Sequence, residues 1–282
     1  MINNFLYLFL ILTLMESSLI STLKEDKQRT IFIIGDSTAA NKDTSGGKVE
    51  RGWGMMFQNC FDENYIKIDN HALNGRSSLS FINEGHWAKV LELIKPGDFV
   101  IIQFGHNDEK DGITRHTDPG TTFDGNLTRY CNETRALGGI PVLMNAVVRR
   151  NFSTVGIKVE DDEALRNTTY ADGAKVEEAD ILLDTHFDYR FAPKNVAQKL
   201  NVYFVDANKI THELEQGLGV EGSKKLHMWF LPGQEPSEPK GKQDNTHYNK
   251  YGAQVVANLL ADGLCEEIPE LKKFRKYVNP EK

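Results

Sequence analysis

Short continuous apolar runs alternate with longer segments of helical periodicity along most of this 282-residue chain. Such a run predicts a strand buried on both faces, which is typical of a parallel sheet covered by helices. The strongest is "DFVIIQFG", because it follows the Pro-Gly turn of "KPGD". Five runs of this kind occur, at residues 30–36, 65–72, 98–105, 139–148 and 201–207.

Between these runs lie segments whose apolar residues recur at helical spacing. Gly138 gives one of them a C-terminal cap, and Pro193 limits another to its second half. The segments cover residues 81–94, 123–138, 187–200 and 249–264. Because strand and helix alternate, we predict an α/β fold, a three-layer α/β/α sandwich with a central parallel sheet of about five strands. It would form a single domain over residues 28–282.

Two polar stretches interrupt this alternation, at residues 150–186 and 230–245. Neither has clear helical or strand periodicity, so we read both as excursions from the fold. In open α/β sheets, ligands bind beyond the carboxyl ends of the strands. We therefore expect both excursions to lie on that side, beside the functional site.

The N-terminus carries the apolar run "FLYLFLILTLM" at residues 5–15, broken only by Thr13. It is too short to span a bilayer, which takes about 20 residues. One interpretation is a buried first helix, but an all-apolar start without periodicity packs poorly in that role. We favour a signal peptide at residues 1–22, and hence a secreted or periplasmic protein without membrane insertion after leader removal.

The charge balance restricts the partners of the chain. Its formal net charge is -7, with 26% charged and 40% hydrophobic residues, as in an ordinary soluble globular protein. No basic cluster marks a nucleic-acid surface. The pairs Arg149-Arg150 and Lys272-Lys273 are too short for one, and we expect them to be solvated.

The cysteines form no metal-binding or disulfide framework. Cys60, Cys131 and Cys265 lack the spacing of metal ligands, and either one bridge or three buried thiols fits the pattern. Four glycosylation sequons matter only in a eukaryotic secretory pathway. They begin at Asn126, Asn132, Asn151 and Asn167.

Three predicted strands lead into residues with chemical potential. Ser37 follows the first strand, either as a nucleophile or as a plain helix cap. Gly75 follows the second and can present its backbone N–H, although a turn glycine has the same signature. Asn107 follows the third, where its side chain can donate to an oxyanion or simply favour a turn.

The segment "DNTH" places Asp244 three residues before His247, in a predicted loop that enters the last helix. This spacing lets the carboxylate hold one imidazole nitrogen while the other acts as a base. A metal site would need a third ligand in a motif such as H-E-x-x-H, which the chain lacks. We therefore expect no metal and no organic cofactor. Among the other histidines, His186 is a candidate for the edge of the pocket.

The order Ser, Gly, Asn and Asp-x-x-His resembles the four blocks of the SGNH (GDSL-type) hydrolases, over about residues 30 to 265. The resemblance implies their flavodoxin-like fold. The G-x-S-x-G elbow of the α/β-hydrolases is absent. The motifs "IIGDSTAA", "GWG", "NGRSS", "FGHND" and "DNTHYNKYGA" look like the rhamnogalacturonan acetylesterase branch, whose members deacetylate pectin outside the cell or in the periplasm.

The resemblance also implies roles for individual residues. Ser37 would be the nucleophile, His247 its base and Asp244 the acid that orients the base. The backbone N–H groups of Ser37 and Gly75, with the side chain of Asn107, would form the oxyanion hole.

For an anionic pectin substrate, Arg51 and Arg76 are candidate cations near the site. Trp53 could stack on a sugar, although a buried core tryptophan fits equally well. An esterase acting on xylan, lipids or small aryl esters is an alternative, as is a carbohydrate-binding protein that has lost catalysis. The sequence leaves the polysaccharide, the acetyl position and the oligomeric state open.

Overall fold

The computed structural model describes residues 27–152 and 180–281. Its centre is a parallel sheet with the strand order β3-β1-β4-β5-β6. The five strands are β1 (Arg29–Gly35), β3 (Ile66–Asn70), β4 (Phe99–Gln103), β5 (Ile140–Met144) and β6 (Tyr203–Val205). They coincide with the five predicted apolar runs, so the predicted sheet is confirmed.

The apolar runs form strands because both faces of the sheet are buried. All five residues of β4 are buried. Along β1, Ile31 and Ile33 enter one hydrophobic core, and Phe32 and Ile34 enter the other. This alternation is the two-residue period of a strand, with apolar residues at both phases.

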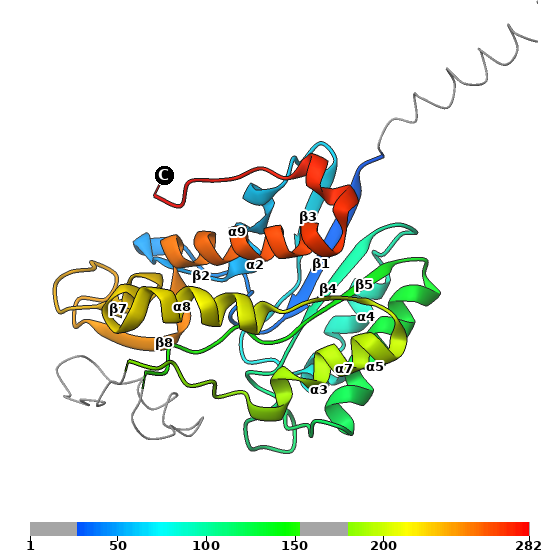
Figure 1. Ribbon diagram of the computed structural model, residues 1–282, viewed down its shortest axis with the longest axis horizontal. Helices are drawn as coiled ribbons and strands as arrows, with labels where there is room; N and C mark the ends of the chain where they lie inside the picture. Colours follow the sequence, from blue (N-terminus) through cyan, green and yellow to red (C-terminus); the bar gives the residue numbers. More distant parts are fainter. Residues whose placement is uncertain (1–26, 153–179, 282) are drawn as a thin grey trace, which may run out of the picture.

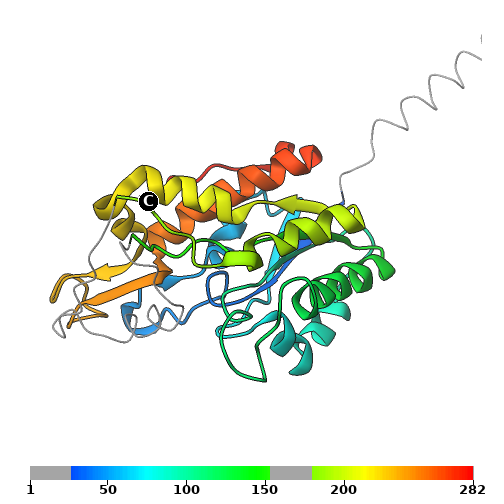
Figure 2. The ribbon, with the colours of Figure 1, turned by 60° about the horizontal axis from the view of Figure 1, so that its bottom comes forward.

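Helices cover both faces and complete the predicted three layers (Figures 1 and 2). One face packs against α2 (Trp53–Met56), α8 (Ala207–Ser223) and α9 (Lys250–Glu267). The other packs against α3 (Ser78–Asn83), α4 (His86–Leu91), α5 (Thr122–Ala136) and α7 (Ala192–Leu200). Short 3-10 helices lie at Ser45–Gly47, Phe57–Cys60, Phe187–Arg190, Lys224–Leu226 and Pro269–Phe274.

The helices differ from the predictions at three places, one of which is the unpredicted short helix α2. The segment predicted as one helix at 81–94 is divided between α3 and α4, because Gly85 adopts a φ of 77° between them. The prediction missed α8, which Asp206 caps by accepting a hydrogen bond from the Lys209 N–H. Glycines such as Gly219, which has non-helical backbone angles, weaken the helical pattern of α8.

A second, antiparallel sheet was not predicted. Its order is β2-β8-β7, and Figure 1 shows it at one end of the molecule. The strands are β2 (Glu50–Arg51), β7 (His227–Phe230) and β8 (Lys242–Asn249). Asp244 and His247 therefore lie on strand β8, which corrects the prediction of a loop. The polar sequence of β8 concealed the strand, although its five residues from Asp244 to Tyr248 are buried.

The topology places a ligand site where β1 lies between β3 and β4. The chain winds outward in both directions from β1, and such a switch point opens a crevice at the carboxyl ends of the strands. The three cysteines are buried free thiols. Within the described residues, no helix combines the length and apolar character needed to cross a membrane. The predicted leader and residues 153–179 of the first excursion lie outside the described residues.

Candidate active site

Ser37 lies in the turn directly after β1 and is 9% exposed. The preceding Asp36 organises this turn, because its carboxylate accepts hydrogen bonds from the N–H and hydroxyl groups of Thr38, at 2.9 and 2.8 Å. The Asp36 carbonyl also accepts from the backbone of Ala40. Asp36 therefore serves as the local cap, and the Ser37 hydroxyl is directed elsewhere.

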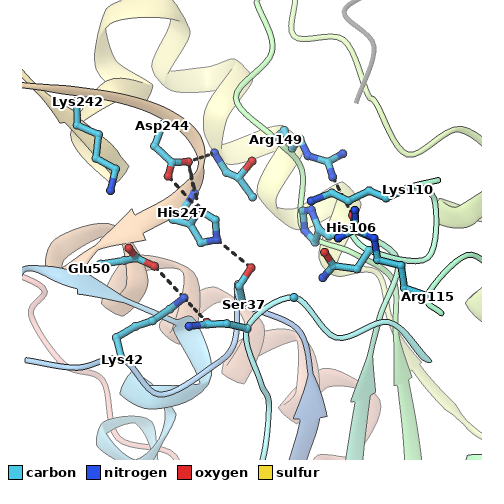
Figure 3. Close-up of a pocket in the computed structure, with 14 residues that line it drawn as sticks. Ser37, Lys42, Glu50, His106, Lys110, Arg115, Arg149, Lys242, Asp244 and His247 are labelled. Atoms are coloured by element: carbon cyan, nitrogen blue, oxygen red, sulfur yellow. Dashed lines mark hydrogen bonds and ion pairs between the residues drawn. The ribbon is translucent and has the colours of Figure 1, made fainter. Parts of the chain in front are cut away.

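The Ser37 hydroxyl meets His247, which is 210 residues away in the chain (Figure 3). The distance from Oγ to His247 Nε2 is 2.8 Å. On the other side of the ring, Nδ1 lies 3.0 Å from Asp244 Oδ2. With the Nδ1 proton directed at the carboxylate, Nε2 accepts from the serine hydroxyl. The three predicted residues thus form one continuous hydrogen-bonded line.

The Asp244 carboxylate is buried but remains charged. Its Oδ1 accepts backbone hydrogen bonds from Thr246 and His247, at 2.9 and 3.0 Å. Burial by itself would raise the pKa of Asp244, but His247 and these N–H donors hold the pKa well below its usual range. A permanent carboxylate can therefore orient the imidazole and stabilise its protonated form.

Gly75 and Asn107 face the same pocket as Ser37. Gly75 has a φ of 75°, a conformation that favours glycine, in the turn after β3. The Asn107 side chain donates one amide hydrogen to the Arg76 carbonyl at 3.1 Å, which fixes the orientation of the amide. An amide has two donor hydrogens, so the second can reach a ligand.

The pocket has a volume of about 470 Å³. Its acidic residues are Glu50, paired with Lys42, and Asp244, paired with His247. The basic residues outnumber them and lie on both sides of the Ser37–His247 pair (Figure 3). These five are Lys42, Lys110, Arg115, Arg149 and Lys242. Three of the five already pair with carboxylates, Lys42 with Glu50, Arg149 with Glu109 and Lys242 with Glu238, so the positive excess is smaller than this count.

Within the described part of the chain, none of the four residues predicted to bind substrate lines this pocket. Arg51 donates to backbone carbonyls, and Arg76 pairs with Glu84 at 2.9 Å. Trp53 and His186 are both 0% exposed, so neither can contact a sugar. Neighbouring side chains of a strand point to opposite sides. Glu50 on β2 faces the pocket, so Arg51 points away from it.

Sequence reasoning missed the five cations that do line the pocket. Lys110 follows "FGHND" closely, and Lys242 precedes Asp244 by two residues. For Lys110 and Lys242, closeness in sequence to these two motifs was the signal that could have identified them. Arg149 gave the opposite signal, because the Arg149-Arg150 pair was expected to be solvated. The two side chains are buried, with residue exposures of 2% and 1%.

Arg149 belongs to a charged cluster behind the pocket wall. Its guanidinium lies 2.5 Å from Glu109 Oε1, and His186 Nδ1 lies 3.0 Å from Glu109 Oε2. Burial alone would raise the pKa of Glu109, but Arg149 and His186 bring it below the usual value. His186 Nε2 lies 2.9 Å from the Val147 carbonyl, to which it donates. The cluster therefore holds His186 in the interior and explains why it does not reach the pocket edge.

Three groups of this region have the chemistry of metal ligands. The ligand atoms of His106, Glu109 and His186 lie within 4.8 Å of one another. However, the Arg149 guanidinium already pairs with the carboxylate, and its positive charge opposes a bound cation. His106 lines the pocket, and burial keeps its pKa well below the usual range, so it presents a neutral ring. The contacts of these described residues form an ion-paired cluster.

Arg150 anchors the strand that carries the Asp-His pair. Its backbone N–H donates to the Asn245 carbonyl at 2.8 Å, and its guanidinium donates to Asn245 Oδ1 at 3.2 Å. The same oxygen accepts from Trp229 Nε1 at 3.0 Å. Asn245 thus ties β8 to the neighbouring chain beside Asp244.

Known proteins share both the sequence and the fold. Residues 33–255 match the GDSL-like lipase/acylhydrolase family. The chain is 35% identical to the rhamnogalacturonan acetylesterase RhgT of Bacillus subtilis over 236 residues, which cover 84% of this chain and 89% of the relative.

Two crystal structures have the same fold. The Bacillus subtilis protein YxiM superposes with a TM-score of 0.62 at 23% identity, covering 85% of this chain and 56% of YxiM. A catalytic mutant of Axe2, an acetylxylan esterase from Geobacillus stearothermophilus, gives 0.52 at 18% identity, covering 87% and 96%. Because the family match covers most of its length and RhgT is 35% identical, the chain belongs to the GDSL-like lipase/acylhydrolase family of carboxylic ester hydrolases.

Proposed function

We propose that this protein is a serine esterase that removes O-acetyl groups from an acidic plant cell-wall polysaccharide, rhamnogalacturonan in pectin being the best candidate. One domain over residues 28–282 would carry the activity. The observation that supports this most strongly is the hydrogen-bonded line from Ser37 through His247 to Asp244, in a pocket that Gly75 and Asn107 also face. The 35% identity to RhgT supports the choice of polymer.

The first half of the reaction acetylates Ser37. His247 Nε2 removes the hydroxyl proton while Oγ attacks the acetyl carbonyl carbon. The oxyanion is held by the N–H groups of Ser37 and Gly75 and by the Asn107 amide, each contributing about 3 kcal/mol to the transition state. The protonated imidazole then passes its proton to the sugar oxygen, which leaves as an alcohol.

The second half releases acetate. Water enters the position of the sugar, His247 removes its proton, and the resulting hydroxide attacks the acetyl-serine carbonyl. The same oxyanion donors act again, and the imidazolium returns its proton to Ser37 Oγ. Asp244 stays ionised throughout, consistent with its lowered pKa. The chain's own residues supply every group that these steps use.

The composition of the pocket supports an anionic polymer. Half-buried Lys242 lies on one side of Ser37, and half-buried Lys110 and Arg115 lie on the other (Figure 3). Cations on two sides of an ester suit a chain of uronate carboxylates that crosses the site. Xylan has far fewer carboxylates. Lipid would need an apolar wall, whereas the described lining residues are polar or charged apart from Gly75.

Export would bring the enzyme to such a substrate. The proposed signal peptide at residues 1–22 is supported by its apolar core and by the polar stretch that follows it. Expression of the full chain with its leader, followed by N-terminal sequencing of protein from the medium or periplasm, tests the proposal. We expect a new N-terminus before the first strand, and retention of Met1 on an intracellular protein would contradict it.

Acetate release from acetylated rhamnogalacturonan, acetylxylan and p-nitrophenyl acetate tests the function. We expect the highest kcat/KM on the pectic polymer and a loss of at least roughly 10⁴-fold in kcat for Ser37→Ala on all three substrates. A preference for xylan would replace the polymer but keep the mechanism. Undiminished turnover by Ser37→Ala would exclude Ser37 as the nucleophile, and polymer binding without acetate release would indicate a non-catalytic protein.

A further inference from the structure

Lys42 lies at the edge of the pocket with its ammonium group enclosed. Its side chain is only 5% exposed. The Nζ atom lies 2.7 Å from Asn74 Oδ1 and 2.8 Å from Glu50 Oε1, and Figure 3 shows Lys42 and Glu50 below His247 and beside Ser37. One lysine therefore bridges two segments that are distant in the sequence.

The Asn74 end of this bridge adjoins the proposed oxyanion donor. Asn74 directly precedes Gly75, whose φ of 75° defines the turn after β3. A side chain added to Gly75 would meet no atom within 4 Å, so packing at that residue does not fix the turn. The Asn74 side chain, held by Lys42, is a direct anchor for the position of the Gly75 N–H.

The Glu50 end adjoins the proposed base. Glu50 is on β2, which pairs with β8 through Glu50↔Asn249 and Arg51↔Tyr248. Burial alone would raise the pKa of Glu50, but His247 and Lys42 lower it, so the carboxylate stays charged. The bridge thus ends on the strand that is bonded to the strand of His247.

We propose that Lys42 is a positioning residue, which ties the Gly75 turn to the β2–β8 sheet and so sets the oxyanion hole at the correct distance from Ser37 and His247. This inference rests on the proposed function, because it assigns a purpose to a contact beside the same oxyanion hole. The Lys42 side chain is 5% exposed and that of Glu50 is 29% exposed, so removal of Lys42 leaves a partly buried carboxylate without its partner.

A different role would leave a different kinetic signature. If Lys42 instead contacted a substrate carboxylate, its loss would raise KM for the acidic polymer and leave hydrolysis of an uncharged ester unchanged. A misplaced donor that acts only in the transition state lowers kcat without raising KM, on every ester. The uncharged substrate p-nitrophenyl acetate therefore separates the two roles.

The experiment compares Lys42→Met, Lys42→Arg and Asn74→Ala with the wild-type protein, on p-nitrophenyl acetate and on the acetylated polymer. We expect Lys42→Met and Asn74→Ala each to lower kcat by roughly 10-fold to 100-fold on both substrates, a part of what the loss of an oxyanion donor costs. KM should change by less than about 2-fold. Lys42→Arg should recover part of the kcat, and the Lys42→Met/Asn74→Ala double variant should lose little more than either single variant.

Lys48→Met is the matched control. Lys48 forms a solvent-exposed pair with Asp43 and is not among the described residues that line the pocket. We expect it to match the wild-type protein. An unchanged kcat on p-nitrophenyl acetate for Lys42→Met, or full additivity in the double variant, would overturn the positioning role. If Lys42→Met fails to fold by circular dichroism, Asn74→Ala, which keeps the Lys42–Glu50 pair, decides the question alone. Failure of the proposed function itself would be separate, as a wild-type protein with no esterase activity.

Discussion

The two sheets contribute to the site in different ways. The parallel sheet supplies Ser37, Gly75 and Asn107 from turns that follow β1, β3 and β4, at the edge where α/β folds commonly bind ligands. The small antiparallel sheet supplies Asp244 and His247 from within strand β8. The reacting groups on the first sheet are thus carried by turns on a hydrophobic scaffold, whereas those on the second are part of the strand itself. The second region should be the more sensitive to substitutions near the site.

Within the small sheet, the largest effect on kcat is expected at Asp244. Asp244→Asn keeps the size of the side chain but removes the charge that fixes the His247 tautomer, and we expect kcat to fall about 10⁴-fold. Steady-state kinetics on p-nitrophenyl acetate measures the loss. Near-normal turnover with a circular dichroism spectrum like that of the wild type would show that another group orients the base.

A smaller effect is expected from Asn245→Ala. This change leaves the buried Arg150 guanidinium and Trp229 indole without the shared acceptor that they have in the wild type. We expect a loss of about 1–3 kcal/mol in the free energy of unfolding. A lower kcat should accompany it, because β8 is released beside Asp244. Urea denaturation and kinetics on the same preparation check both. Asn59→Ala removes a partly buried amide contact with Gln254 on α9, outside the hydrogen bonds that hold Asn245, and should leave kcat unchanged.

Two buried aspartates, one from each region, have pKa values that are shifted in opposite directions. Burial raises the pKa of Asp108, which accepts hydrogen bonds from Ser78 and Thr117 beside the parallel sheet, to about 7. The proton on Asp108 therefore stabilises the fold fully below the unfolded pKa near 3.8, and this contribution is lost as the pH rises through about 7. The pKa of Asp244 is lowered, so its contribution is present above about pH 4 and is lost as the pH falls further.

The melting temperature measured from pH 5 to pH 9 tests this difference. Asp108→Asn mimics the protonated acid, so its Tm relative to the wild type should rise by a few degrees across this range. A constant difference would show that Asp108 does not change its ionisation between pH 5 and pH 9.

The smallest expected effect is that of chelation. Because Arg149 pairs with Glu109 in the cluster with His106 and His186, treatment with EDTA should leave kcat and Tm unchanged. Elemental analysis of the purified protein is the second measurement. A stoichiometric metal, or an activity that EDTA removes and a divalent cation restores, would require Arg149 to move aside and would contradict the ion-paired arrangement.

The sequence predicts the parallel sheet well because burial on both faces leaves a continuous apolar signature. Ser37, Gly75 and Asn107 become candidates from it, since each lies within three residues after the end of such a run. The contact of Ser37 with His247 required more than periodicity. We inferred this contact because the order of the motifs resembles that of a known family.

The remaining features could not be predicted from local patterns. Strand β8 is buried yet polar, because its side chains form the site rather than the core, so its sequence reads as a loop. Arg149 is buried through an ion pair with Glu109, a partner 40 positions earlier that only the fold brings near. Glu50 and Arg51 form a two-residue strand, so their side chains point to opposite sides. The sequence does not show which of the two faces the pocket.

The strand order β2-β8-β7 also has a consequence for biosynthesis. It joins a segment near residue 50 to one near residue 245, so the small sheet cannot form until almost the whole chain is available. A chain that leaves the ribosome from its N-terminus would complete the proposed nucleophile and the proposed oxyanion donors long before the proposed base. Nascent or C-terminally truncated chains would then be inactive as esterases, and hydrolysis would begin only when synthesis and folding are complete.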